Sequence, residues 1–265
     1  MLIDGVAVAK QLQQATAKRI ATLSTPPRTA IIACAPNTVT KQYLAIKQTA
    51  ASELGIELEV QEYAASSTTA DLVAAVTKSV DTVDAVVVQL PLPAHIDTAT
   101  VLSAIPASHD VDGLTPDSPY LSPVVGSIKA MVEQYHIPMR HAQVVVVGAG
   151  ALVGVPAAVW CAQAGAQVTI ATKEAPQPEA LAQADVVISG AGVPHLITPD
   201  MVKEGVVLFD AGTAEAGGMV RGDVAPVCAD KAAFMTPVPG GIGPVTISVL
   251  MDNITTAAAA RAYES

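Results

Sequence analysis

Apolar runs and helix-like stretches alternate along the first third of the chain. Three runs are predicted to be strands, because two are mostly apolar and one alternates apolar with polar positions: "RTAIIAC", "DAVVVQLPLP" and "IELEVQEY". One helix is predicted before the first strand, from a cap at Asp4 to about Leu23. Two more are predicted between the strands, over about 40–54 with a stop at Gly55 and near 69–79. This alternation predicts parallel strands joined by right-handed crossovers.

The same alternation resumes beyond a Pro-rich stretch from Pro106 to Pro123. A helix is predicted over about 125–135, and four strand-like runs follow it: "AQVVVVGAG", "AQVTIAT", "ADVVISGAG" and "GVVLFDAGT". The segment "TPVPGGIGPVT" then interrupts the pattern before an Ala-rich helix from about Ile247 to Ala262. Two βα series separated by a Pro-rich seam predict an α/β protein with two lobes and a cleft between them.

Composition and charge narrow the class of protein. Of the 265 residues 51% are hydrophobic, but only one Trp, five Tyr and two Phe are aromatic, so the core is expected to be Ala, Val, Leu and Ile. Such a core suits parallel sheets that helices cover on both faces. Asp and Glu outnumber Lys and Arg by 24 to 14, and the net charge of −10 opposes a broad phosphate-binding surface. Nucleic acid is therefore not expected as a partner.

Neither a metal site nor a membrane segment is expected. Cys34, Cys161 and Cys228 show no CxxC spacing and are expected to be reduced core residues, and the histidines show no ligand pattern such as HExxH. The N-terminal segment lacks a long apolar region, and no run approaches the roughly 20 apolar residues of a membrane span. A soluble cytoplasmic protein is the expectation.

The run "VVVVGAGALVGVP" places glycines between a predicted strand and a predicted helix. Gly148 and Gly150 allow a tight turn with close backbone approach, and amides at a helix N-terminus suit an anion such as pyrophosphate. The spacing is GxGxxxG rather than GxGxxG, so a plain strand-to-helix turn remains an alternative. The next strand ends in "IATKE", which offers Lys173 and Glu174 near the place of the usual ribose-binding acid.

Polar residues that suit acid–base chemistry lie in the first lobe. Tyr43 and Lys47 stand four residues apart, so a helix would bring them to one face, about 5–6 Å apart at Cβ. Gln89 ends the third predicted strand, at the edge where α/β sheets bind ligands, and Asp112 is the second acid of "HDVDG". Taken singly, these could also be an exposed lysine, a strand-end amide and a turn former. Asp110 is expected to be a turn or cap residue.

Five motifs occur in an order that resembles the bifunctional methylenetetrahydrofolate dehydrogenase/cyclohydrolase family: "YLAIK", "VVVQLPLP", "HDVDG", "GAGALVGVP" and "TPVPGGIGPVT". The resemblance implies a folate-binding catalytic lobe of residues 1–121 plus 246–265, and a Rossmann-like lobe of residues 122–245, usually within a homodimer. It also implies two activities of one-carbon metabolism. The first is oxidation of 5,10-methylenetetrahydrofolate with NADP, or with NAD as the alternative. The second is hydrolysis of the methenyl product to 10-formyltetrahydrofolate.

The resemblance also implies the roles of individual residues. Lys47 would be the general acid/base, Tyr43 would orient the folate, and Asp112 would accept N–H groups of the pterin. The implied catalytic residues are Lys47, Tyr43, Gln89 and Asp112, and the implied substrate-binding residues are Thr40, Tyr43, Gln89, Leu90, Pro91, Asp112, Pro239 and Gly240. The implied cofactor-binding residues are Gly148, Ala149, Gly150, Leu152, Val153, Lys173, Ala191, Gly192 and Thr213. Lys173 is the cation expected to bind the 2′-phosphate of NADP.

Several positions depart from the family pattern. Thr40 stands where serine is usual, His109 replaces a lysine, and Ala149 and Gly150 replace the common arginine or alanine and the serine of the glycine loop. "LSPVVG" stands in place of PCTPxG, after a shortened loop. Two alternatives therefore remain: a cyclohydrolase with weak or lost dehydrogenase activity, and a noncatalytic folate- or nucleotide-binding protein.

Overall fold

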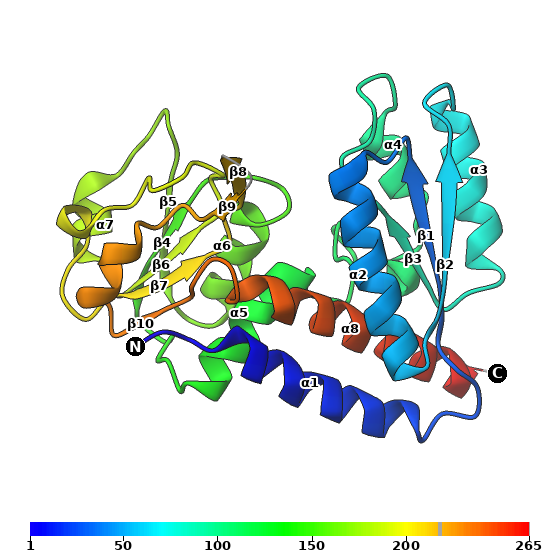
Figure 1. Ribbon diagram of the computed structural model, residues 1–265, viewed down its shortest axis with the longest axis horizontal. Coiled ribbons are helices and arrows are strands. Elements are labelled where there is room, and N and C mark those ends of the chain that lie inside the picture. The colour runs from blue at the N-terminus through cyan, green and yellow to red at the C-terminus, as the bar shows by residue number, and fades with distance from the viewer. Residues whose placement is uncertain (217–218, 265) are drawn as a thin grey trace. The chain divides into compact units, whose positions relative to one another are not determined.

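A computed structural model of the chain describes residues 1–216 and 219–264, which form two compact units. The three-strand unit contains residues 11–121 and the chain from 247 onward, and the five-strand unit contains residues 1–10 and 122–246. Both units alternate strands with helices (Figure 1), so the predicted α/β class with parallel sheets is confirmed.

The three-strand unit is built on a parallel sheet in the order β2-β1-β3. Its elements are β1 (Arg28–Cys34), α2 (Thr38–Leu54), β2 (Glu57–Tyr63), α3 (Thr69–Val80), β3 (Ala85–Val88), α4 (Thr98–Ser103) and a 3-10 turn at Ala107–His109. Alternate residues of β1 face opposite sides. Ile31 packs with α2 and with α8 (Ile242–Glu264), whereas Ile32 packs with α3 and α4. Helices therefore bury both faces of the sheet, as parallel strands require.

The five-strand unit is built on a second parallel sheet, in the order β10-β7-β6-β4-β5. Its strands are β4 (Gln143–Val147), β5 (Gln167–Ala171), β6 (Val186–Ser189), β7 (Val207–Asp210) and β10 (Phe234–Met235). Its helices are α5 (Pro123–Gln134), α6 (Gly154–Gln163) and α7 (Pro178–Gln183), with 3-10 turns at Pro199–Met201 and Pro226–Asp230. β8 (Ala214–Ala216) pairs antiparallel with β9 (Met219–Arg221). The first helix, α1 (Gly5–Ile20), spans the boundary between the two units.

Both sheets share one topological feature. In each unit the first strand pairs with the second strand on one side and with the third on the other, so the strand order reverses at β1/β3 and at β4/β6. Helices that leave the carboxyl ends of two such strands turn to opposite faces, which opens a crevice where α/β proteins bind ligands. Each unit therefore has its own candidate site at this reversal.

Two boundaries differ from the expected ones. Residues 1–10 belong with the five-strand unit, because Ile3 N donates to Met235 O at 2.8 Å and Leu2 forms an isolated parallel β-bridge with Met235. The final helix begins at Ile242, five residues before the expected Ile247, because Pro244 falls in its first turn, where a helix needs no N–H. The cap predicted at Asp4 is confirmed, since its carboxylate accepts from Ala7 N at 2.9 Å.

Candidate active site

Lys47 and Gln89 meet at the β1/β3 reversal of the three-strand unit. Asn37 caps α2 by accepting from Thr40 N, and the helix carries the half-buried Lys47 to a point where Nζ donates to Gln89 Oε1 at 3.0 Å. Gln89 Nε2 donates to Leu90 O at 2.9 Å, so the two bonds together fix the orientation of the amide. The Leu90–Pro91 peptide that follows is cis. Tyr43 lies one turn before Lys47 and is 46% exposed, which leaves its ring available to a ligand.

The two acids of "HDVDG" differ in their surroundings. Asp110 is fully buried, and its carboxylate accepts from Leu114 N, from Thr115 N and from Thr115 Oγ1. The predicted turn role of Asp110 is thereby confirmed. Asp112 is partly buried and has no hydrogen-bond partner within the described part of the chain. Desolvation raises the pKa of Asp112, the charge of Lys47 opposes this rise, and the charge of Asp110 adds to it. The carboxylate therefore lies within electrostatic reach of the lysine and has lone pairs to offer a ligand.

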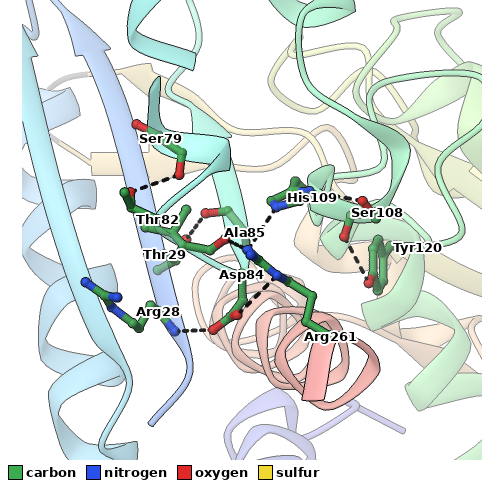
Figure 2. A network of polar contacts seen from close by, with 11 residues as sticks. Arg28, Thr29, Ser79, Thr82, Asp84, Ala85, Ser108, His109, Tyr120 and Arg261 are labelled. Atoms are coloured by element: carbon green, nitrogen blue, oxygen red, sulfur yellow. Dashed lines mark hydrogen bonds and ion pairs between the residues drawn. The ribbon is translucent and has the colours of Figure 1, made fainter. Parts of the chain in front are cut away.

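A polar network anchors the segment that precedes these acids (Figure 2). Asp84 accepts from Arg28 N at 2.8 Å and pairs with Arg261 of α8 at 3.9 Å. Arg261 also donates to Val83 O and lies 3.2 Å from His109 Nε2. Because a guanidinium can only donate, Nε2 is the acceptor, and the network places the neutral ring's proton on Nδ1, 3.0 Å from Ser108 Oγ. The histidine that replaces the usual lysine thus joins the end of α8 to the start of the "HDVDG" segment.

The glycine loop occupies the β4/β6 reversal of the five-strand unit. Gly148 has a φ of +98°, and a Cβ on Gly154 would lie 2.0 Å from Gly148 O. Only glycine therefore lets α6 start so close to β4, and the wider spacing still gives a close-packed strand-to-helix turn. The first turn of α6 has no side-chain cap and no acidic residue, so its amide end is suited to an anion. Gly154 was not among the predicted cofactor residues, although the GxGxxxG spacing contained it.

Lys173 and Glu174 form the tip of the turn that follows β5. Thr172 and Ala175 exchange backbone hydrogen bonds of 2.9 and 3.2 Å across them, and both side chains are exposed. Gly148 N donates to Ala171 O at 2.9 Å, so this turn begins beside the glycine loop. The lysine is therefore placed on the same edge of the sheet as the loop.

The loops after β6 and β7 contain polar residues that the sequence did not predict. Asp223 is completely buried and accepts from the amides of Ala191, Gly192 and Val193 and from Ser189 Oγ. The N–H groups of the predicted cofactor residues Ala191 and Gly192 are thus already used, which leaves their carbonyl groups and Cα atoms for a ligand. Thr213 is exposed next to the buried Gly212. No motif spacing points to Asp223, because its partner Ser189 lies 34 residues away.

The structure brings most predicted substrate residues into one unit. Thr40, Tyr43, Lys47, Gln89, Leu90, Pro91 and Asp112 belong to the three-strand unit. Pro239 and Gly240 belong to the five-strand unit, where the Val238–Pro239 peptide is cis and Gly240 has a φ of +98°. In the described residues no three His, Cys, Asp or Glu side chains gather as a metal site, and no helix is long and apolar enough to cross a membrane.

Two parallel α/β sheets, one bearing a lysine–amide pair and the other a glycine loop at the strand reversal, define an enzyme with a nucleotide-binding unit. Family models identify it further. The model "Tetrahydrofolate dehydrogenase/cyclohydrolase, catalytic domain" matches residues 3–112, and "Tetrahydrofolate dehydrogenase/cyclohydrolase, NAD(P)-binding domain" matches residues 123–262. The chain belongs to the tetrahydrofolate dehydrogenase/cyclohydrolase family, so the resemblance seen in the sequence is confirmed.

Individual relatives agree along nearly the whole chain. The "Bifunctional protein FolD" of Ralstonia nicotianae is 39% identical over 99% of this chain and 96% of its own length. A crystal structure of the bifunctional enzyme FolD from Campylobacter jejuni has a TM-score of 0.95 at 31% identity and covers 98% of this chain and 99% of that chain. FolD of Trypanosoma brucei, complexed with NADP cofactor and inhibitor, has a TM-score of 0.93 at 30% identity and covers 100% and 99%. Neither alternative, a cyclohydrolase alone or a noncatalytic binder, is favoured by these relatives.

Proposed function

We propose that this bifunctional enzyme oxidises 5,10-methylenetetrahydrofolate with NADP and hydrolyses the resulting 5,10-methenyl form to 10-formyltetrahydrofolate, with Lys47 as the proton-transfer group. The observation that carries the proposal is the 3.0 Å hydrogen bond from Lys47 Nζ to Gln89 Oε1 at the strand reversal of the three-strand unit. Bound NADP supplies the acceptor for the hydride that leaves the one-carbon bridge.

Hydrolysis consumes one water and releases one proton. Water attacks the methenyl carbon, and Lys47 in its neutral form takes one proton from it. When one carbon–nitrogen bond of the bridge breaks, the ammonium returns that proton to the leaving nitrogen, and the remaining hydroxyl proton is released as the formyl C=O bond forms. Gln89 orients Nζ through its neutral amide oxygen, which accepts from the amine at 3.0 Å. The amide is itself fixed by Leu90 O, which limits the directions in which the proton can move.

Asp112 is proposed to bind the pterin. Its carboxylate is desolvated and lacks a hydrogen-bond partner in the described residues, whereas the aminopyrimidine edge of a pterin presents adjacent N–H donors. Two such donors would supply the bonds that the protein leaves unmade. The exposed ring of Tyr43 is proposed to pack on the folate, and Thr40, Leu90, Pro91, Pro239 and Gly240 to contact it.

The five-strand unit fits a dinucleotide. Gly148 and Gly154 leave room at the strand-to-helix turn, and the uncapped N-terminus of α6 suits the pyrophosphate. Lys173 is proposed to bind the 2′-phosphate of NADP, since an ammonium on a phosphate is worth more than a ribose hydrogen bond. The relative from Trypanosoma brucei, which was solved with NADP, supports this choice over NAD. Ala149, Gly150, Leu152, Val153, Ala191, Gly192 and Thr213 complete the proposed cofactor set.

Assembly and location are also proposed. The edge strand β5 has no partner on its outer side among the described strands, and the exposed Ile170 on it accompanies the exposed Val155 and Val159 of the adjoining α6. A second copy of this chain is the proposed occupant, giving a homodimer. Light scattering should give twice the mass of 26.9 kDa, and Val159→Glu should reduce it to the mass of one chain.

A cytoplasmic location is proposed because all three cysteines are buried and free.

The decisive test is a pair of assays on the purified protein. Oxidation of methylenetetrahydrofolate is followed with NADP and with NAD, and hydrolysis of methenyltetrahydrofolate is followed without either nucleotide. Both activities are expected, with higher kcat/KM for NADP. Hydrolysis without oxidation would favour the cyclohydrolase alternative, and folate binding with neither activity would favour the noncatalytic one.

A further inference from the structure

Two buried carboxylates lie at the carboxyl edge of the five-strand sheet and take no part in the chemistry proposed above. Asp210 ends β7 and is 3% exposed, and Asp223 follows β9 and is 0% exposed. Neither carboxylate forms an ion pair within the described part of the chain; both are held by hydrogen-bond donors instead. Burying a carboxylate without a neighbouring cation costs folding free energy unless hydrogen bonds compensate. The donors that surround these two acids therefore indicate that the acids hold nearby backbone in place.

Asp223 gathers the amides of the loop that follows β6. Ala191 N and Val193 N donate to it at 2.7 Å each, Gly192 N donates at 3.2 Å, and Ser189 Oγ donates at 2.7 Å. Three consecutive N–H groups thus point at one carboxylate, although Gly192 and Val193 are exposed on their other side. The conformation of this loop therefore depends on a charge that lies beneath it.

The same loop touches the glycine loop across the β4/β6 reversal. A Cβ on Gly148 would lie 3.0 Å from Gly190 O, and a Cβ on Gly190 would lie 2.7 Å from Val153 Cγ1. The residues from Gly190 to Val193 therefore form one wall of the crevice in which an α/β sheet binds its nucleotide. A shift of this wall changes the space available to the cofactor.

Asp210 holds Asp223 in turn. Its carboxylate accepts from Gly212 N at 3.1 Å, from Asp223 N at 3.0 Å and from Val224 N at 2.9 Å. Two glycines make room for the pair: a Cβ on Gly222 would lie 2.0 Å from Asp210 Oδ2, and a Cβ on Gly212 would lie 2.0 Å from Asp223 Cγ. Each carboxylate fills the space that a side chain at the glycine would need, so the two acids and the two glycine-containing loops pack tightly together.

We propose that Asp223 is a positioning residue for the dehydrogenase reaction, which fixes the loop Gly190–Val193 as a wall of the cofactor crevice and is itself fixed by Asp210. The inference rests on the proposed function, since it requires NADP to bind at the β4/β6 reversal. It assigns Asp223 no contact with the folate and no part in hydrolysis, whose proton-transfer residue lies in the other unit.

The test uses Asp223→Asn in the full-length protein, because asparagine keeps the size of the side chain but turns one acceptor into a donor that faces N–H groups. The expected result is a KM and a calorimetric Kd for NADP raised by about tenfold or more, with the kcat of oxidation changed less, as for a lost charge-assisted hydrogen bond. Hydrolysis of methenyltetrahydrofolate should stay within about twofold of the wild-type rate, since Lys47 and Gln89, which are proposed to carry its proton transfer, belong to the three-strand unit.

The matched control is Asp185→Asn. Asp185 also accepts from a backbone amide, Gln143 N at 2.7 Å, and from Lys203, but it precedes β6 and so lies at the amino edge of the same sheet. This variant should lower the Tm while leaving the Kd for NADP unchanged. Equal losses of NADP affinity in both variants would reduce Asp223 to a general structural role and overturn the proposal.

Two further outcomes are separated by the design. A folded Asp223→Asn that binds NADP like the wild type would overturn the inference, whereas a wild type that neither binds NADP nor oxidises the folate would overturn the proposed function instead. If Asp223→Asn does not fold, Ser189→Ala carries the test, because it removes one donor and keeps the charge. It should weaken NADP binding about threefold with unchanged hydrolysis, less than Asp223→Asn, because the three backbone amides still hold the carboxylate; unchanged NADP affinity would overturn the proposal.

Discussion

The two strand reversals of this protein differ in the groups that they present to a ligand. At β1/β3 the ligand-facing groups are side chains, a lysine held by a glutamine and a desolvated carboxylate. At β4/β6 they are backbone groups, a glycine loop and an uncapped helix end, and the nearby carboxylates turn inward to hold loops. Under the proposed function, the same topology serves proton transfer in one unit and anion binding in the other, since the fold provides the crevice and the residues provide the chemistry.

The largest expected effect tests whether proton transfer belongs to the three-strand unit alone. Lys47→Met should reduce hydrolysis of methenyltetrahydrofolate by about 10²–10⁴-fold, the usual loss for a missing general acid–base group. The calorimetric Kd for NADP should not change. Lys41→Met is the matched control, since Lys41 lies on the same helix and forms an exposed ion pair with Glu62 at 3.1 Å. This variant should hydrolyse methenyltetrahydrofolate at the wild-type rate. A folded Lys47→Met within a few-fold of wild type would remove the lysine from the mechanism.

The second effect concerns the unpartnered carboxylate. Asp112→Ala should weaken binding of a folate analogue by about 2–5 kcal/mol, as for a charge-assisted pair at a desolvated site, and leave NADP binding intact. Calorimetry with each ligand separates the two results. Asp117→Ala, an exposed acid in the same segment, should bind the analogue like the wild type. Unchanged affinity in Asp112→Ala would exclude a contact between this acid and the pterin.

The third prediction concerns the backbone of the five-strand unit, where a change should weaken NADP binding and spare hydrolysis. Gly154→Ala forces a Cβ against Gly148 O, and overpacking of this kind costs about 1–3 kcal/mol, so the NADP Kd should rise and the Tm should fall. Gly243→Ala is the control, because a Cβ there meets nothing within 4 Å and Gly243 lies outside the proposed cofactor set. Hydrolysis should survive both changes. Equal NADP affinities for the two variants would show that the close approach at Gly154 does not shape the cofactor site.

A smaller effect is expected at the tip of the turn after β5. Lys173→Ala should reduce the ratio of kcat/KM with NADP to that with NAD by about tenfold, because an exposed ammonium contributes less than a buried one. Glu174→Ala should raise the same ratio, since its carboxylate repels a phosphate. Steady-state kinetics with both nucleotides measure it. A wild-type preference for NAD, or a ratio that Lys173→Ala leaves unchanged, would contradict the assignment.

The smallest effect is a pH dependence of stability that belongs to the three-strand unit. Burial lowers the pKa of His109 below 6.5, the charge of Arg261 lowers it further, and the carbonyls of Val80 and Val83 and the charge of Asp84 oppose this. The folded state therefore favours the neutral ring, so its contribution is complete above the unfolded pKa and is lost as the pH falls through the folded pKa. Urea unfolding at pH 7.5 and pH 5 should show this loss in the wild type and less of it in His109→Gln. An equal loss of unfolding free energy in the wild type and in His109→Gln would contradict a contribution from His109.

The apolar runs in the sequence predicted the strands of both sheets except β10, because buried parallel strands are near-continuous apolar runs bounded by turn formers. β10 was missed because it has only two residues. The helices α4 and α7 were missed, since six residues are too few to show a helical period. The antiparallel pair of β8 and β9 was missed as well, because strands of three residues show no clear alternation. The early start of α8 was hidden by Gly243 and Pro244, which read as a turn but fit a first helical turn.

The candidate site divides in the same way. Lys47, Gln89 and Asp112 were predictable because each lies in a motif, and the structure adds the hydrogen bond that joins the first two. Asp223 was not predictable, because a buried acid among 24 acidic residues has no local signature, and its partners come from a loop about 30 residues away. Contacts between distant segments follow from the fold, which a local pattern does not contain.

The division of the chain into units has a consequence for its synthesis. Neither unit is continuous, since residues 1–10 belong with 122–246, and residues from 247 onward complete the unit that begins at residue 11. Leu250, Met251 and Ile254 of α8 cover the face of the sheet that contains Ile31 and Val87. On the ribosome, Lys47 therefore emerges early, in a unit whose sheet has one face uncovered until α8 is made. The nucleotide-binding unit is thus complete before the three-strand unit, and in that interval the uncovered apolar face is the kind of surface that chaperones protect from aggregation.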